Sequence, residues 1–183
     1  PGPLHGGSSI EKLSIETPRL TLRTFTMEDF DALWEIFGDP VVMEHVAPYT
    51  EEETWEFLRT FCVERDPPGA CAAVRKEDGR LIGYLLCKQI DEPGIYELGW
   101  IFRRDVWRQG YAYEAVSALM DHLFRVRRVH KVMAETEDAV RSLGLMKKLG
   151  LRQEGLFRKH CLVQGGRWLD LYWCGLLRED YLN

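Results

Sequence analysis

Apolar residues recur along this 183-residue chain with two periods, one typical of strands and one typical of helices. Leu20 and Leu22 alternate with Thr21 and Arg23, which predicts a half-buried strand near the start of the ordered chain. Between Tyr111 and Arg125, apolar side chains instead recur every three or four residues. This second pattern predicts an amphipathic helix with one face turned to a core.

Capping and stop signals outline three more helices. Thr26 precedes two acidic residues and predicts the start of a helix that ends at Gly38–Pro40. Thr50 and Glu53 form a capping-box pattern at the start of a second helix, which ends before Asp66–Gly69. A short helix is predicted over Arg141–Leu149, with Gly150 after its last residue.

Runs of apolar and β-branched residues separated by turn signals predict the remaining strands, several of them in hairpins. The predicted strands are Ala70–Arg75, Leu81–Gln89, Ile95–Phe102, Val129–Thr136, Gly155–Val163 and Trp168–Leu177. The element order is therefore β-α-α-β-β-β-α-β-α-β-β. This order predicts a mixed α/β fold, in which a mostly antiparallel sheet meets one helical crossover.

Length and composition bound the class of protein. We expect residues 17–183 to form a single domain and residues 1–16 to be a flexible leader or an expression remnant. No apolar run is long enough for a membrane helix, so no membrane association is expected. The net charge of -5 argues against a nucleic-acid binder and is compatible with a cationic substrate.

The five cysteines are an odd number, and no pair has C-x-x-C spacing. Several of them lie in apolar runs, as Cys87 and Cys174 do. They are interpreted as reduced thiols of a cytoplasmic protein, with neither a disulfide framework nor a metal site.

The segment with the clearest chemistry runs from Glu97 to Ala115, where a strand is followed by a short basic loop and then by a helix. The first turn of a helix offers unpaired N–H groups and a positive dipole end. Gly110 at this point lets a ligand approach the backbone, and Arg103 and Arg108 add positive charge. The pattern predicts a pyrophosphate site, although a simple turn glycine with solvated arginines would look the same.

Trp107–Ala115, with the sequence WRQGYAYEA, resembles the acyl-CoA loop of the GNAT N-acetyltransferases. Further resemblance to the branch of ribosomal-protein N-terminal acetyltransferases covers nearly the whole chain, from Thr17 to Tyr181. The resemblance implies a GNAT-like, mostly antiparallel central sheet with helices on both faces. It also implies transfer of an acetyl group from acetyl-CoA to a primary amine by direct attack in a ternary complex.

The same resemblance implies which residues bind the cofactor. Backbone amides from Arg108 to Ala112 would hold the pyrophosphate, and the strand at Leu98–Phe102, splayed from its neighbour, would run beside the pantetheine arm. An amide near Trp100–Phe102 would polarise the thioester carbonyl. The expected cofactor-binding residues are Trp100, Ile101, Phe102, Arg103, Arg108, Gln109, Gly110, Tyr111 and Ala112.

Two positions depart from the family pattern. Ala139 stands where the family usually has an asparagine that contacts the cofactor, and Met146 stands where many members have a tyrosine general acid. Ser142 matches a serine near the coenzyme thiol and is nominated to stabilise or protonate the thiolate. Glu97 is nominated as the general base, because an alkylammonium must lose a proton before attack; an outward-facing strand residue is an equal interpretation.

Two functions remain open at this point. The first is an N-acetyltransferase whose acceptor is a protein or peptide N-terminus, with a small-molecule amine as the other option. The second is an acyl-CoA-binding module or sensor with little catalytic activity. Ala139 and Met146 support this alternative, because they replace residues that the family usually has at these positions. Either a monomer or a homodimer fits the sequence.

Overall fold

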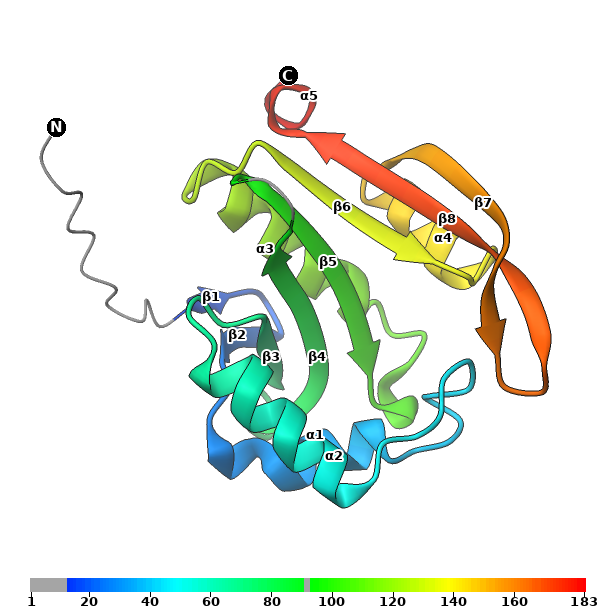
Figure 1. Ribbon diagram of the computed structural model, residues 1–183. Helices are drawn as coiled ribbons and strands as arrows, with labels where there is room; N and C mark the ends of the chain where they lie inside the picture. Colours follow the sequence, from blue (N-terminus) through cyan, green and yellow to red (C-terminus); the bar gives the residue numbers. More distant parts are fainter. Residues whose placement is uncertain (1–12, 91–92) are drawn as a thin grey trace, which may run out of the picture.

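The computed structural model describes residues 13–90 and 93–183, which form one twisted sheet with helices against both faces (Figure 1). The predicted leader falls mostly outside these residues, as do two residues of the turn after Gln89. The strands are β1 Ser14–Glu16, β2 Leu20–Thr24, β3 Ala70–Arg75, β4 Arg80–Gln89, β5 Ile95–Phe102, β6 Lys131–Thr136, β7 Arg152–Val163 and β8 Arg167–Leu177. The helices are η1 Met27–Asp29, α1 Phe30–Phe37, α2 Glu51–Phe57, η2 Leu58–Glu64, η3 Arg104–Val106, α3 Tyr111–Arg125, α4 Arg141–Lys148 and α5 Arg178–Leu182.

The eight strands lie in the order β1-β2-β3-β4-β5-β6-β8-β7. Every neighbouring pair is antiparallel except β5 and β6, which are parallel and joined by the crossover helix α3. The predicted mixed α/β architecture and its mostly antiparallel sheet are confirmed. None of the helices in the described part of the chain has the length and apolar character needed to cross a membrane.

Two short elements near the ends of the described chain escaped the sequence patterns. Ser14–Glu16, assigned above to the leader, form β1 and pair with β2 through Ile15 opposite Leu22. Arg178–Leu182 form α5 at the end of the chain. Both are too short to show a period of their own, and the partner strand or the preceding strand fixes their conformation.

Two apolar clusters lie on opposite faces of the sheet. On one face, α3 and α4 pack on the sheet through residues such as Leu119, Phe124 and Met146. On the other face, α1 and α2 cover β3 and β4, with Leu33, Phe37 and Tyr84 at the centre. The sheet is therefore covered on both sides, as the resemblance implied, and Figure 1 shows the two helical layers.

The parallel pairing of β5 with β6 stops after three residue pairs, the last of which joins Glu97 to Met133. Beyond that pair, β5 continues to Phe102 and β6 continues to Thr136. Each is held there by its outer neighbour, β4 or β8. The two strands therefore diverge, and a V-shaped gap opens in the middle of the sheet (Figure 1).

Alternate residues of β5 turn their backbone groups toward this gap. The amide of Arg103 donates to Ile82 on the β4 side, and the carbonyl of Ile95 accepts from Ile90 on the same side. Because the backbone direction alternates along a strand, the odd-numbered residues between them face β4. The amides of Trp100 and Phe102 consequently face the gap, whereas that of Ile101 does not.

Candidate functional site

The loop between β5 and α3 has an unusual backbone that follows from its sequence. Gly110 is the N-cap of α3 and has a φ of 80°, which is the left-handed conformation that glycine adopts most easily. Arg108, two residues earlier, also has a positive φ of 63°. Left-handed residues of this kind turn successive amides inward, and such concave amide arrangements bind anions. The α3 dipole adds positive charge at the same point.

Trp107 fastens this loop to the end of β5. Its indole Nε1 donates to the carbonyl of Phe102 over 2.8 Å, and Arg141 from α4 lies over its ring. This bond uses a backbone acceptor that β6 leaves free once the strands diverge. Trp107, at the first position of the predicted loop motif, therefore holds the loop against the end of β5.

Glu114, in the first turn of α3, ties the helix to the turn between β1 and β2. It accepts hydrogen bonds from the Thr17 hydroxyl and from the backbone and side chain of Arg19, at 2.7 to 2.9 Å. The Arg19 guanidinium then lies over the Tyr111 ring, 4.0 Å from its centre. Burial by itself would raise the pKa of Glu114, but these hydrogen bonds outweigh it and lower the pKa.

We expect Glu114→Gln to destabilise the fold by about 1–3 kcal/mol at pH 7, because Arg19 loses a charged partner. A carboxylate with a lowered pKa stabilises the folded state above its unfolded pKa, and this contribution is lost as the pH falls through the folded value. The deficit of the variant should therefore shrink as the pH drops below about 4.3. Urea unfolding of both proteins at pH 7 and pH 3.5 measures this, and a deficit that is equal at both pH values would contradict it.

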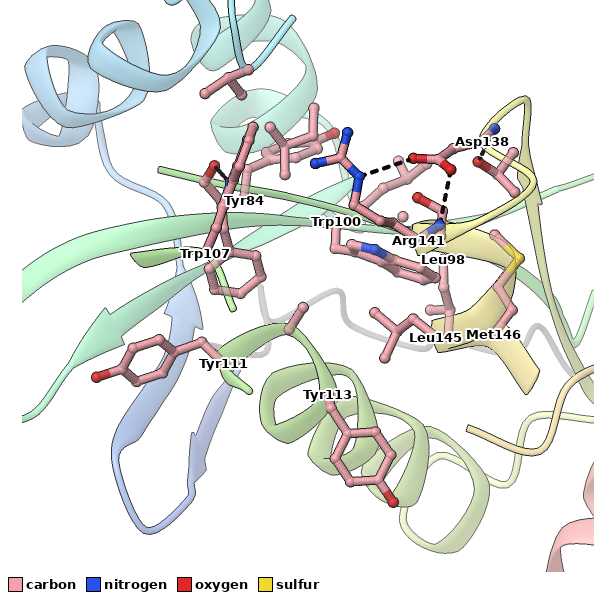
Figure 2. Close-up of a pocket in the computed structure, with 18 of the residues that line it drawn as sticks. Tyr84, Leu98, Trp100, Trp107, Tyr111, Tyr113, Asp138, Arg141, Leu145 and Met146 are labelled. Atoms are coloured by element: carbon pink, nitrogen blue, oxygen red, sulfur yellow. Dashed lines mark hydrogen bonds and ion pairs between the residues drawn. The ribbon is translucent and has the colours of Figure 1, made fainter. Parts of the chain in front are cut away.

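A cavity of about 640 Å³ occupies the gap between β5 and β6 and extends to the start of α3 (Figure 2). Residues of β5, of the loop and of α3 form one part of its wall, and α4 forms the facing part. Figure 2 shows Trp100 and Leu98 near Leu145 and Met146 of α4, with Tyr111 and Tyr113 at the start of α3. The cavity thus joins the loop between β5 and α3 to the free edge of β5.

Most of the residues selected from the sequence line this cavity. The lining includes Trp100, Ile101, Phe102, Arg108, Gly110, Tyr111, Ala112 and Ser142. Three selected residues lie outside the lining and bond elsewhere. Arg103 pairs with Glu35 and Asp105, Gln109 donates to the Asp105 carbonyl, and Glu97 lies 3.7 Å from the Lys88 ammonium.

Asp138 has a role that the sequence did not reveal. Its side chain accepts hydrogen bonds from the amides of Val140 and Arg141, both near 3 Å, and so caps the N-terminal end of α4. The cap fixes the helix whose side chains Ser142 and Met146 line the cavity. An acidic residue followed by a helical pattern is the signal that would have identified it.

The cavity also has a distinctly acidic part. Glu44, Glu135, Glu137 and Asp138 line it together with His45. The loop after α1 covers this part, since His45 Nδ1 lies 2.8 Å from Glu137 and Glu44 lies 3.3 Å from Arg141. Gln164, from the β7–β8 turn, bonds to the carbonyls of Met43 and Val46 in the same loop.

Comparisons with known proteins agree with this geometry. A family described as the acetyltransferase (GNAT) domain matches residues 19–152. The uncharacterized N-acetyltransferase YnaD of Bacillus subtilis is 30% identical, and the match covers 92% of this chain and 99% of YnaD.

Two solved structures extend the comparison. A GNAT-family acetyltransferase from Bacillus anthracis has a TM-score of 0.82 and 28% identity, with 92% of this chain and all of that chain covered. Spermidine N-acetyltransferase from Vibrio cholerae, solved with CoA and spermine, has a TM-score of 0.79 and 19% identity, with 91% and 100% covered.

Proposed function

Because the chain belongs to the GNAT acetyltransferase family, we propose that its acceptor is the free amine of a protein or peptide N-terminus. The family fixes the reaction as transfer of an acetyl group from acetyl-CoA to an amine, so the protein is an acetyl-CoA-dependent N-acetyltransferase. Acetyl-CoA supplies a thioester, whose carbonyl is activated for attack and whose thiol departs. The family leaves the acceptor open, and the proposal concerns that choice.

The cavity offers groups that fit each part of acetyl-CoA. The amides of the loop from Arg108 to Ala112, beside the α3 dipole, suit the pyrophosphate. The free edge of β5 suits the amides of the pantetheine arm, and the inward-facing amides of Trp100 and Phe102 suit the thioester oxygen. Ser142 lines the same cavity, which supports its proposed role of stabilising the departing thiolate.

The acidic part of the cavity is the observation that carries the acceptor proposal. Carboxylates at Glu44, Glu135 and Glu137 favour a positively charged group, and an N-terminal ammonium is one. The resemblance of the chain from Thr17 to Tyr181 to the branch of ribosomal-protein N-terminal acetyltransferases favours a peptide over a free amine. A polyamine such as spermidine would also be attracted by these carboxylates, so it is the second acceptor in the assay below.

The first experiment is thermal unfolding with acetyl-CoA, with CoA and with NAD. Ligand at about 100 times its dissociation constant stabilises the folded state by about 2.7 kcal/mol, so acetyl-CoA and CoA should raise the melting temperature and NAD should not. No shift with acetyl-CoA would contradict the cofactor site.

Thiol release from acetyl-CoA is then followed with two acceptors, a peptide with a free N-terminal alanine and spermidine. A higher kcat/KM for the peptide supports the proposed acceptor, and a higher value for spermidine overturns it. Cofactor binding without turnover on any amine would instead support the acyl-CoA-binding module.

We also infer a cytoplasmic location from the thiols. All five cysteines are free, and three of them, at Cys62, Cys71 and Cys174, are buried. Burial raises the pKa of the half-buried Cys87 thiol to about 12, so it stays protonated and unreactive. Free thiols in this number are typical of a reducing compartment.

A further inference from the structure

The carboxylate first nominated as the base is held away from the cavity. Glu97 is opposite Lys88 in the β4–β5 ladder, and their charged groups are 3.7 Å apart. Its side chain is 18% exposed and is not part of the cavity wall. A base must reach the proton that it removes, directly or through one water.

Glu135 on β6 is better placed for that task. It lies two residues beyond Met133, the partner of Glu97, and so stands on the same face of the sheet but inside the diverging gap. Its side chain lines the cavity and is open to it. The free edge of β5, where the thioester would lie, is the other side of the gap.

The charges around Glu135 come from four elements. Glu97 of β5 and Glu137 after β6 repel a second negative charge, whereas Lys88 of β4 and His160 of β7 attract it. Burial, followed by the repulsion from Glu97, raises the pKa of Glu135 above its ordinary value. A raised pKa makes a carboxylate a stronger base near neutral pH.

Tyr84 adds a second polar group to the wall of the same cavity. It is only 5% exposed, its ring packs against Phe37 and Phe57, and it belongs to the cavity wall. Burial raises the pKa of Tyr84, so the hydroxyl stays neutral and can accept a hydrogen bond from an ammonium group.

We propose that the acceptor nitrogen binds between Glu135 and Tyr84, and that Glu135 is the base that deprotonates it. This inference rests on the proposed N-acetyltransferase function. One proton passes from the ammonium to Glu135, and the neutral nitrogen then bonds to the acyl carbon while the carbon–sulfur bond breaks. The second proton released from the nitrogen goes to the departing thiolate, so that an amide and a free thiol remain.

The decisive variants are Glu135→Gln and Glu97→Gln, assayed with the alanyl peptide and with spermidine across pH 5.5 to 9. Loss of a general base costs about 100- to 10,000-fold, so Glu135→Gln should lower kcat/KM by at least 100-fold. It should also move the acidic limb of the wild-type pH profile up to the pKa of the free amine, which is about 8 for an N-terminal amine. Glu97→Gln should lower kcat/KM less than tenfold and keep that limb. An equal or larger loss in Glu97→Gln, or a loss below tenfold in Glu135→Gln, would overturn the assignment.

Three further variants separate the role from the fold. Glu135→Asp should keep the acidic limb at a reduced rate, and Tyr84→Phe should raise KM for the amine about tenfold with little change in kcat. Glu154→Gln removes a carboxylate of β7 that pairs with Lys131, and it should leave kcat and KM unchanged. All variants should keep the rise in melting temperature that acetyl-CoA causes. If Glu135→Gln no longer showed this rise, the role of Glu135 would be tested with Glu135→Asp instead. An unchanged rate in Glu135→Asp would then contradict the proposal.

A measurement without turnover distinguishes this inference from the proposed function. In carboxyl-labelled protein loaded with CoA, the NMR signal that disappears in Glu135→Gln should move when spermidine or the alanyl peptide is added. Movement without turnover would keep the amine site and contradict the acceptor proposal. Turnover by the wild-type protein without movement of that signal would refute the role of Glu135.

Discussion

Replacing Gly110 with valine is expected to weaken acetyl-CoA binding by about 5- to 150-fold. Gly110 has a φ of 80°, and holding a β-branched residue in the left-handed region costs about 1–3 kcal/mol. An added Cβ meets no backbone, and the nearest atom is an Arg19 nitrogen at 3.5 Å. The cost therefore comes from the backbone angle, and the loop can relieve it only by turning its amides away from the pyrophosphate. Calorimetric titration with acetyl-CoA measures the change.

Gly79→Val is the matched control for that variant. Gly79 has a φ of 69° in the turn between β3 and β4, with open space around it and no part in the cavity. It should lose a similar amount of stability and keep the affinity for acetyl-CoA. If Gly110→Val bound acetyl-CoA as tightly as Gly79→Val does, the loop would not be the pyrophosphate site.

Phe124→Ala is expected to destabilise the protein by about 3–5 kcal/mol, the usual cost of removing a buried aromatic side chain. Phe124 is completely buried in the last turn of α3. Its ring stacks on that of Tyr181 in α5, with 4.8 Å between the two ring centres. The truncation leaves a cavity between the crossover helix and the end of the chain. The midpoint of urea unfolding, with an unchanged m-value, reports the loss.

Val126→Ala, two residues later, provides the comparison. Val126 is 67% exposed, so its truncation should change the free energy of unfolding by less than about 0.5 kcal/mol. Similar losses in the two variants would mean that α3 is not packed as described. Because α3 also begins at the loop proposed to bind the cofactor, Phe124→Ala tests whether the core supports that loop.

Most of the elements could be predicted from the sequence because their signals are local. The apolar stripe of Tyr111–Arg125 and the capping box at Thr50 and Glu53 are complete within a few turns, and both appear in the structure as predicted. The three-residue strand β1 could not be predicted, because its conformation comes from its pairing with β2. Local patterns do not report such contacts.

The site was only partly predictable for the same reason. The loop from Arg108 to Ala112 has a motif, and the structure brings all of its residues except Gln109 together with Ser142 around one cavity. The position of Glu135 depends on where the pairing of β5 with β6 ends, and that end is a property of two strands. The contact of His45 with Glu137 joins residues 92 positions apart and has no local signal.

The early end of the β5–β6 ladder has a consequence for amide hydrogen exchange. Gly99 and Ile101 are protected by β4, whereas the amides of Trp100 and Phe102 face the gap, so slow and fast exchange should alternate residue by residue along a single central strand. A strand in the middle of an eight-stranded sheet would normally be protected throughout. If exchange slowed only at the amides of Trp100 and Phe102, a ligand would have bound in the gap and accepted the hydrogen bonds that β6 does not accept there.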